Sequence, residues 1–359
     1  MIENSTETRS RIVTRAFTPA AATADDWRAY HRYMRRRAAE EAPEDPIPED
    51  NVRQRDMLTE WPLFETHRVL ALIDGEIVGS LAMWTRRKGT PDYEEHARFI
   101  GADAGVRRDA RRRGVATVLL AVLAAFMREG GYVTATMSAR VGGGTAYLDS
   151  IGAAEKHRVM ESRLDLASVD RVMLRGWEAA VDRSGELIWE IHAGRVPLDR
   201  FEELIPALTT MFNSQPLGTL ELPPMRYDME QIKAWYADMD AHGGDHIMVL
   251  LRNGDELVAM SEASWIADFP DRAFQNLTAV APSWRGKGLA KAIKARMLRA
   301  LSERRPEIGL IITVNANVNA AMLAINRQLG FVHHREVRTY QIGRDGIEAA
   351  LAARTVSLS

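Results

Sequence analysis

The sequence has 359 residues, which exceeds the roughly 100–150 residues that one hydrophobic core usually serves, so we expect two domains. Hydrophobic residues make up 46% and charged residues 27%, and the formal net charge is -2; this balance gives no electrostatic reason to expect nucleic acid or an anionic membrane as a partner. The absence of cysteine excludes disulfides, thiolate metal sites and a cysteine nucleophile.

The beginning of the chain, MIENSTETRSR, is polar, and nowhere do about 20 apolar residues run together. We therefore expect a cytoplasmic protein without a membrane segment. The histidines show no metal-ligand spacing. His242 and His246 are separated by a Gly-Gly-Asp segment that would break a helix carrying both, so we expect loop histidines and no metal.

The first half of the chain contains a hairpin signal, then a basic loop and a helix. An Asp-Gly pair at residues 74–75 lies between apolar segments, and such a pair favours a tight hairpin turn. The loop at residues 106–116 reads VRRDARRRGVA. Apolar residues then recur at i, i+3, i+4 and i+7 up to residue 126, and the glycines at 130–131 end the predicted helix.

The second half repeats this order. An Asn-Gly pair at residues 253–254 gives the second hairpin, and the loop VAPSWRGKGLA at residues 280–290 aligns with the first loop at an offset of 280 − 106 = 174. The helix that follows has its apolar stripe at every fourth residue from Leu289, with Lys294 off the stripe. A glycine after each later helix recurs at an offset of 330 − 152 = 178. Similar offsets indicate a duplicated unit.

The connector SVDRVMLRGWEAAVDRSG is predicted to be helical and ends in a glycine. We therefore expect an N-terminal unit at residues 1–168, a linker helix at 169–186 and a C-terminal unit at 187–359. Each unit reads as strand, helices, hairpin, strand, helix, strand, helix, strand. This order predicts the α/β (α+β) class, with helices packed on a mixed sheet.

Each basic loop opens a helix, where free N–H groups and the helix dipole favour an anion. Glycine allows close approach to the backbone, and the arginines and lysine of the loops add positive charge. We therefore expect a diphosphate there. The alternative is that both loops are solvated basic turns, but the recurrence of the loop in register in both repeats argues against it.

These segments resemble a known family. The loop at residues 280–290 resembles the coenzyme A diphosphate loop of the GNAT acetyltransferases, and TVNANVNAAMLAINRQLGF at residues 313–331 resembles a second conserved stretch of bacterial tandem members. In the first unit the loop matches, whereas ARVGGGTAYLDSIGA at residues 139–153 lacks the asparagines. The residues that the resemblance places at the cofactor are Ala279, Val280, Arg285, Gly286, Lys287, Gly288, Leu289, Ala290, Arg111, Arg113, Gly114 and Ala116.

The resemblance implies a mostly antiparallel sheet in each unit, with a central parallel pair of strands that splay apart. In the second unit these strands are FQNLTAV and GLIITVNA, and the pantetheine arm of acetyl-CoA, or of another acyl-CoA, lies between them. Asn315 and Asn319 then either bond this arm or cap the next helix. No metal is implied.

The implied reaction is direct attack of a primary amine on the thioester in a ternary complex. The position at which many family members carry an acid tyrosine is Asn326 in the second unit and Leu148 in the first; neither can protonate a thiolate, so Asn326 is a candidate by position alone. Glu262 is the candidate base, unless it is a surface glutamate facing solvent. Thr278 and Asp271 are lesser candidates.

The second unit retains more of the pattern and is expected to be catalytic, whereas the first is structural or binds coenzyme A. The expected acceptor is a small-molecule amine, with Trp235, Tyr236, Trp265 and Trp189 either lining its site or forming core. The alternatives are an acyl-CoA sensor without chemistry and a protein lysine or N-terminal acetyltransferase. We expect no nucleic-acid or membrane partner, and either a monomer that is an internal pseudo-dimer or a homodimer.

Overall fold

The computed structural model describes residues 11–90, 92–182 and 185–356. Residues 1–10 of the first expected unit and residues 183–184 of the expected connector lie outside them. Within the described residues, no helix combines the length and apolar character needed to cross a membrane. The elements up to residue 165 are β1 (Val13–Ala16), α1 (Ala24–Glu41), α2 (Asp50–Leu58), β2 (Phe64–Ile73), β3 (Glu76–Arg86), α3 (Tyr93–His96), β4 (Phe99–Val106), α4 (Val115–Gly130), β5 (Thr134–Arg140), α5 (Gly143–Ser150) and β6 (Ala154–Asp165). Those that follow are α6 (Arg171–Asp182), β7 (Leu187–Ala193), α7 (Leu198–Asn213), α8 (Met229–Ala241), β8 (Asp245–Asn253), β9 (Glu256–Trp265), β10 (Arg272–Val280), α9 (Leu289–Arg304), β11 (Leu310–Ala316), α10 (Ala320–Leu329), β12 (Val332–Gly343) and α11 (Arg344–Val356).

The chain forms two compact units, each assembled from separate segments of the sequence. Unit 1 contains the chain up to Ser138, then Ala146–Ala154, and finally the segment from Tyr340 onward; unit 2 contains Ala139–Thr145 and Glu155–Thr339. Nearly all of β6, the last strand of the first repeat, therefore belongs to unit 2, while the end of β12 and helix α11 belong to unit 1. The repeats thus exchange their last elements. The sequence boundaries 1–168, 169–186 and 187–359 describe the repeat and remain a prediction.

Pairings inside each unit illustrate this exchange. In unit 2, β6 pairs antiparallel with β11, from Leu310 opposite Asp165 to Ala316 opposite Val159. In unit 1, Gln341 at the end of β12 donates a hydrogen bond to Thr136 of β5 at 3.2 Å. Helix α11 packs beside α4. The exchanged elements are therefore integral parts of the units that receive them.

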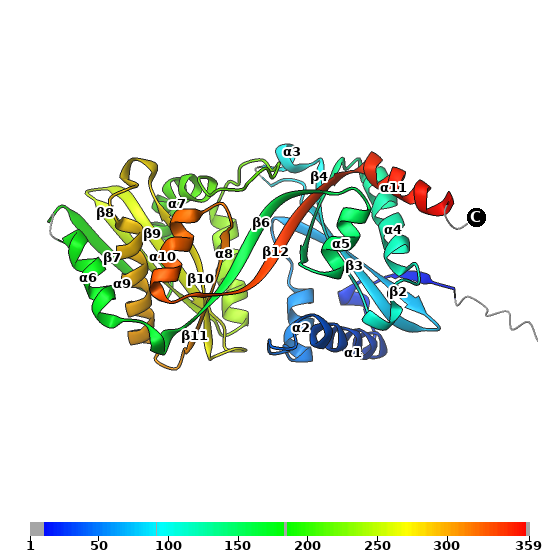
Figure 1. Cartoon of the computed structure of the whole chain (residues 1–359), viewed down its shortest axis with the longest axis horizontal. Coiled ribbons are helices and arrows are strands. Elements are labelled where there is room, and N and C mark those ends of the chain that lie inside the picture. The colour runs from blue at the N-terminus through cyan, green and yellow to red at the C-terminus, as the bar shows by residue number, and fades with distance from the viewer. Residues whose placement is uncertain (1–10, 91, 183–184, 357–359) are drawn as a thin grey trace, which may run out of the picture. The chain divides into compact units, whose positions relative to one another are not determined.

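Unit 2 has two helical layers on one sheet, whose strands follow the order β6-β11-β10-β9-β8-β7. Ile247, Val249 and Leu251 of β8 face the cluster built with α6 and α9. Met248 and Leu250 face the cluster built with α7 and α8. Because successive strand side chains point to opposite faces, this fully apolar run supplies both layers (Figure 1).

Unit 1 repeats this layering on strands in the order β1-β2-β3-β4-β5. Helix α4 covers β2, β3 and β4 on one face, and helix α1 packs against β3 through an aromatic cluster around Trp27 and Tyr30 (Figure 1). The approach of α4 is close, since a Cβ at Gly79 would lie 2.9 Å from Cγ1 of Val115. The mixed α/β class expected from the sequence is confirmed in both units.

Both predicted hairpins form, but with different turns. In the β2–β3 turn, Asp74 and Gly75 have φ of 51° and 81°, as an Asp-Gly turn with two left-handed residues requires. In the β8–β9 turn only Gly254 is left-handed, with φ of 57°. The second turn therefore begins one residue later, and Asn253 is the last residue of β8.

The parallel pair expected at the centre of each sheet is present, and in each unit it separates. In unit 2, Arg272–Gln275 of β10 pair with Leu310–Thr313 of β11, and pairing then stops. In unit 1, β4 and β5 pair over the four positions from Phe99 opposite Thr134 to Ala102 opposite Met137. Beyond these positions the two strands no longer satisfy each other's backbone groups, which leaves a gap open at the ends nearest the basic loops.

Strand β10 carries a bulge that β4 lacks. On β10, Gln275 lies opposite Ala263 and Thr278 opposite Ser261, so two residues, Asn276 and Leu277, face the single residue Glu262. The pairing of β4 with β3 is regular. The bulge is a one-residue insertion, because β10 is offset from β4 by 274 − 101 = 173 before it and by 280 − 106 = 174 after it.

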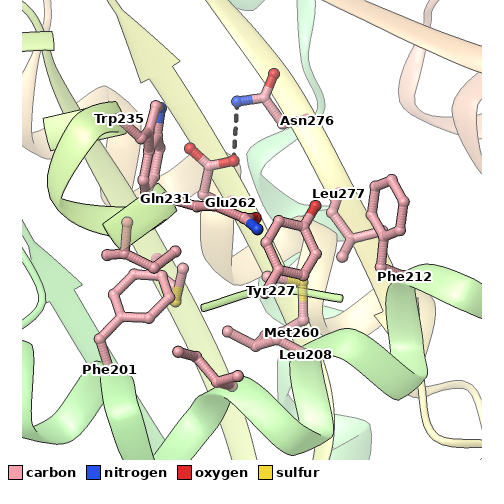
Figure 2. A pocket seen from close by; sticks show the side chains of 13 residues that line it. Phe201, Leu208, Phe212, Tyr227, Gln231, Trp235, Met260, Glu262, Asn276 and Leu277 are labelled. Atoms are coloured by element: carbon pink, nitrogen blue, oxygen red, sulfur yellow. Dashed lines mark hydrogen bonds between the residues drawn. The ribbon is translucent and has the colours of Figure 1, made fainter. Parts of the chain in front are cut away.

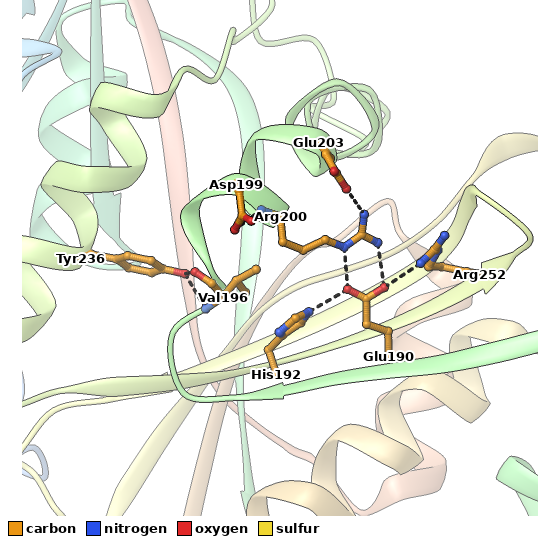
Figure 3. A network of polar contacts seen from close by, with 8 residues as sticks. All are labelled: Glu190, His192, Val196, Asp199, Arg200, Glu203, Tyr236 and Arg252. Carbon is orange, nitrogen blue, oxygen red and sulfur yellow. Dashed lines mark hydrogen bonds and ion pairs between the residues drawn. The ribbon is translucent and has the colours of Figure 1, made fainter.

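A polar network ties strand β7 to helix α7 in unit 2 (Figure 3). Glu190 of β7 accepts two hydrogen bonds from Arg200 of α7, at 2.8 and 2.7 Å. It also accepts from Arg252 of β8 at 3.2 Å and lies 2.8 Å from Nε2 of His192. The hydrogen bond from Arg200, aided by the other donors, lowers the pKa of Glu190 to about 2.

We expect Glu190→Gln to lower the free energy of unfolding by about 2 kcal/mol at pH 7, because the side chain is only 19% exposed and a shift from 4.5 to about 2 sets an upper limit near 3 kcal/mol. Because the pKa of Glu190 is lower in the folded state, ionised Glu190 stabilises the fold at pH values above the ordinary pKa of 4.5. This stabilisation is lost as the pH falls from about 4.5 towards 2. Chemical denaturation at pH 7 and pH 3 checks this. The exposed Glu203→Gln is the control and should stay near wild type; an equal loss for Glu190→Gln at both pH values would contradict the linkage.

Candidate active site

The second basic loop forms a concentration of free backbone donors at the start of α9. Gly286 and Gly288 adopt the left-handed region, with φ of 80° and 79°, and α9 begins at the next residue, Leu289. Within the described chain, no protein acceptor is paired with the backbone N–H groups of residues 286–290. Together with the helix dipole, these donors make a site suited to an anion.

The arginine of this loop holds its shape. Arg285 donates from Nε to the carbonyl of Val280 at 3.3 Å and from Nη2 to Ser214 at 2.9 Å. In the first repeat, Arg111 donates to the carbonyl of Val106, also at 3.3 Å. The structure therefore places these two predicted cofactor residues as braces across the loop. Lys287, by contrast, is exposed, and its ammonium lies 4.2 Å from the centre of the Trp284 ring.

The loop of unit 1 has nearly the same backbone. Gly114 has φ of 90° and precedes α4, as Gly288 precedes α9. Arg112 takes the place of Gly286 and also adopts positive φ, at 64°. A side chain in this region costs roughly 1–2 kcal/mol, so unit 1 retains the anion-binding conformation despite strain. Arg113 is exposed beside it.

The remaining predicted loop residues shape the site from the protein side. Ala279 and Val280 are buried at the end of β10, and Leu289 packs into the core as the first residue of α9. Ala290 is half buried. In unit 1, the carbonyl of Ala116 accepts a hydrogen bond from Tyr147 at 3.1 Å. These residues therefore offer backbone and packing, whereas the charges of the loop lie outside.

The asparagines of the second stretch have separate roles. Asn319 accepts a hydrogen bond from the N–H of Met322 at 3.2 Å, so it caps α10. Asn315, near the end of β11, instead accepts from Asn326 at 2.6 Å. Asn326 is 2% exposed, and its own Oδ1 has no partner. The predicted positions thus place Asn315 and Asn326 together beside the separating strands.

A buried lysine joins α9 to the point at which the strands separate. Lys294 is 1% exposed, although the apolar spacing placed it off the buried stripe. Its Nζ donates to Oε1 of Gln275 at 2.7 Å, and Gln275 is the last residue of β10 paired with β11. Burial lowers the pKa of Lys294 to about 7. The hydrogen bond from Lys294 to Gln275 holds α9, the helix that follows the loop, against the point where β10 and β11 separate.

The opposite face of the sheet has a cavity of about 330 Å³ (Figure 2). Its walls come from α7, α8, the segment before α8, and strands β8, β9 and β10. Asn276 and Leu277, the two bulged residues, open directly onto it. The lining residues are Phe201, Ile205, Leu208, Phe212, Tyr227, Gln231, Ile232, Trp235, Met248, Met260, Glu262, Asn276 and Leu277.

Glu262 projects into this cavity from β9. It is 6% exposed, so the expectation of a surface glutamate facing solvent is wrong. Its Oε2 accepts a hydrogen bond from Asn276 at 2.8 Å, whereas Oε1 has no hydrogen-bond partner and lies 3.7 Å from Nδ1 of His246 (Figure 2). The carboxylate is therefore held by one oxygen, while its other oxygen is buried beside His246 without a hydrogen bond.

The lesser base candidates lie elsewhere. Thr278 bonds Ser261 at 2.8 Å on a stretch of β10 beyond the bulge, and neither lines the cavity. Asp271 immediately precedes β10, its side chain is 61% exposed, and it forms an ion pair with Arg272. Glu262 is therefore the one lining residue with a carboxyl group in the described cavity.

Two tyrosines and a histidine surround the carboxylate. His246 lies on β8 and is fully buried, so the loop expected for it is wrong; its Nε2 is 3.3 Å from the hydroxyl of Tyr236. Burial raises the pKa of Tyr236 to about 12. Burial and the nearby Glu262 raise that of Tyr227 to about 12. Both phenols therefore stay protonated near neutral pH and can donate hydrogen bonds.

The aromatic candidates divide between the cavity and the core. Trp235 lines the cavity, whereas Tyr236 contacts the ring of Trp235 but does not line the cavity. Trp265 is buried in the cluster on the α9 face, and Trp189 packs against that same cluster. The helical wall of the cavity was not predicted from the sequence, because residues such as Phe201 and Leu208 belong to no motif.

Unit 1 lacks the corresponding chemistry. The residue of β3 that matches Glu262 by strand register is Ala82, at an offset of 262 − 82 = 180. The matching stretch of β4 is covered by α1, because Tyr33 donates to the carbonyl of Gly105 at 2.8 Å. Arg37 also lies over Gly105, where a Cβ would come within 2.2 Å of its guanidinium carbon. Unit 1 therefore has the loop without the carboxylate or the bulge.

Comparison with known proteins places these features in context. The family model described as “Acetyltransferase (GNAT) family” matches residues 27–142 and, separately, residues 206–331. The search of curated proteins gives no match. These two matched segments contain both basic loops.

Several solved structures resemble the chain at low identity and therefore show a shared fold. One is a “Tandem GNAT protein from the clavulanic acid biosynthesis pathway (without AcCoA)”, with a TM-score of 0.70 and 18% identity over 93% of this chain and 99% of that one. A GCN5-related N-acetyltransferase from Sphaerobacter thermophilus has a TM-score of 0.64 and 14% identity over 94% and 96%. A glucosamine N-acetyltransferase region of a fungal multi-domain β-N-acetylglucosaminidase has a TM-score of 0.65 and 13% identity over 93% and 38%.

Proposed function

The chain belongs to the GNAT acetyltransferase family, with one copy of the fold in each repeat, and on this premise we propose that its second repeat transfers an acetyl group from acetyl-CoA to the primary amine of a small molecule. The observation that carries the proposal is the position of Glu262. Its carboxylate lines a cavity, and the strand opposite it bulges where the parallel pair separates.

The residues of unit 2 fit acetyl-CoA at two places. The free N–H groups of residues 286–290 suit its diphosphate, and the separated ends of β10 and β11 have backbone groups that suit the amides of its pantetheine arm. When bound, acetyl-CoA supplies a thioester, which is an acyl group with a good leaving group. The buried tie from Lys294 to Gln275 holds these two places in a fixed relation.

Glu262 is proposed as the general base. An amine reaches the cavity largely as an ammonium ion and must lose a proton before it can attack. The carboxylate of Glu262 lines the cavity and is proposed to take that proton, while the hydrogen bond from Asn276 to Oε2 fixes its orientation. Asn326 has no ionisable proton, so we assign it a positioning role, holding Asn315 at the gap.

We propose that unit 1 performs no turnover and is either structural or binds coenzyme A, since it has the loop but Ala82 in place of the carboxylate. In the same proposal the acceptor is a free amine rather than a protein or a nucleic acid, and the chain is an internal pseudo-dimer that functions as a monomer or homodimer. The mostly apolar lining of the cavity supports this, because it offers few partners for the backbone groups of a peptide.

The proposal is tested by incubating the full chain with acetyl-CoA and a mixed panel of primary amines, then detecting free thiol and N-acetylated product by mass spectrometry. We expect product from wild type, and unchanged turnover from a chain whose first loop is disabled by Gly114→Asp. Acetyl-CoA binding without any acetylated amine would instead favour an acyl-CoA sensor. Acetylation of peptides in preference to every amine would favour a protein acetyltransferase.

A further inference from the structure

We propose that the acceptor is a small monoamine whose amino group is attached to an uncharged, apolar body, an aralkylamine or a branched alkylamine. The inference rests on the proposed function and deepens it by naming the substrate class. It depends on three properties of the cavity in unit 2: its charge, the arrangement of its polar atoms, and its size.

The cavity offers one charge. Of the residues that line it, only Glu262 is charged, and no lysine, arginine or histidine is among them. An acceptor that carries a carboxylate or a phosphate would have to bury that group without a cationic partner, which is strongly unfavourable. A second ammonium group would likewise find no second carboxylate. The cavity therefore discriminates against amino acids, amino-sugar phosphates and polyamines.

The polar side chains of the lining gather around Glu262, and the remaining lining is apolar. Glu262 and Asn276 are joined at the strands, and Gln231 and Tyr227 lie near them (Figure 2). The wall formed by α7 is apolar and includes Phe201 and Leu208. An amine bound beside the Glu262 carboxylate therefore directs the rest of the molecule against aromatic and aliphatic side chains, where an apolar body is stabilised by burial.

The volume limits the body. About 330 Å³ lies at the lower end of the roughly 300–1,000 Å³ typical of small-molecule sites. One aromatic ring on a short chain fits this space, whereas a multi-ring amino sugar would extend beyond it. The cavity also offers too few polar groups to replace the water lost by a polyhydroxylated acceptor.

The experiment compares matched acceptors on the full chain by release of free coenzyme A. The probes are 2-phenylethylamine, L-phenylalanine, which adds only a carboxylate, and 1,5-diaminopentane, which replaces the ring by a second amine. We expect kcat/KM for 2-phenylethylamine to exceed the other two by at least 100-fold. Equal rates for 2-phenylethylamine and L-phenylalanine would overturn the inference while leaving the proposed function intact; no acetylation of any amine would contradict the proposed function itself.

A charge introduced into the cavity gives a gain-of-function test. Ile205 is half buried on α7 and lines the cavity, so Ile205→Lys should place an ammonium among the apolar residues. We expect the ratio of kcat/KM for L-phenylalanine to that for 2-phenylethylamine to rise at least tenfold. Ile205→Met, similar in volume and neutral, should leave the ratio unchanged. A folded, active lysine variant with the wild-type ratio would show that acceptors bind elsewhere.

Discussion

Glu262→Gln is expected to lower kcat/KM for acetylation by roughly 100- to 10,000-fold, the range that a positioned general base contributes. Glutamine has the shape of glutamate and can still accept the hydrogen bond from Asn276, so the cavity should keep its form. It cannot take the proton that the attacking ammonium must lose. Steady-state kinetics with a saturating amine should show the loss mainly in kcat.

Two controls separate catalysis from folding. Glu262→Gln should bind acetyl-CoA with wild-type affinity, because the expected cofactor contacts lie at residues 286–290 and between β10 and β11. Glu230→Gln, which alters an exposed glutamate on α8 of the same unit, should have wild-type kinetics. A Glu262→Gln variant within tenfold of wild type would exclude Glu262 as the base and leave it a positioning role.

Gly288→Asp is expected to weaken acetyl-CoA binding by roughly 10- to 100-fold relative to Gly288→Asn, because it adds a negative charge beside the diphosphate. The two side chains have the same shape, and both tolerate positive φ better than other non-glycine residues. A Cβ at Gly288 meets no atom within 4 Å, so neither substitution clashes. The pair therefore isolates charge from strain, and titration calorimetry measures it.

The same pair of substitutions at Gly114 reports on unit 1, where φ is 90° and a Cβ would lie 3.7 Å from Cδ1 of Ile12, an ordinary contact. If both loops bind, wild type should bind two equivalents, and each aspartate variant should lose one. If Gly288→Asp and Gly288→Asn bind equally well, the diphosphate does not lie at the start of α9. Wild type with a single site lost only by Gly288→Asp would make unit 1 purely structural.

The parts of the site predicted from sequence were those encoded locally. A positive φ before a helix requires glycine or a tolerant residue, so the loops at 106–116 and 280–290 stand out even without a structure. The separating strands follow from the family resemblance and are confirmed by the register of β10 with β11. The role given to Arg285 was less complete, since charge suggested a ligand contact and the structure shows a brace to Val280.

The orientation of Glu262 could not be predicted, for a physical reason. Strand β9 is covered on both faces, so seven successive residues from Leu257 to Ala263 are buried and the usual polar–apolar alternation is missing. The bulge could not be predicted either, because one inserted residue within strand β10 changes the repeat offset only from 173 to 174. The cavity wall on α7 and α8 arises from packing between distant segments and has no sequence motif.

The exchange of terminal elements determines when each unit can complete its folding during synthesis of the chain. A ribosome releases residues from the N-terminus, and domains usually fold as they emerge. Here, unit 1 lacks the end of β12 and helix α11 until the whole of unit 2 has been made, while β6 is available before the strand it pairs with, β11. The first repeat therefore waits, with the edge of β5 open, for a partner encoded some 200 residues later. If the two repeats were expressed separately, the first would lack the end of β12 and helix α11, and the second would lack β6. The two repeats therefore depend on each other to complete their folding.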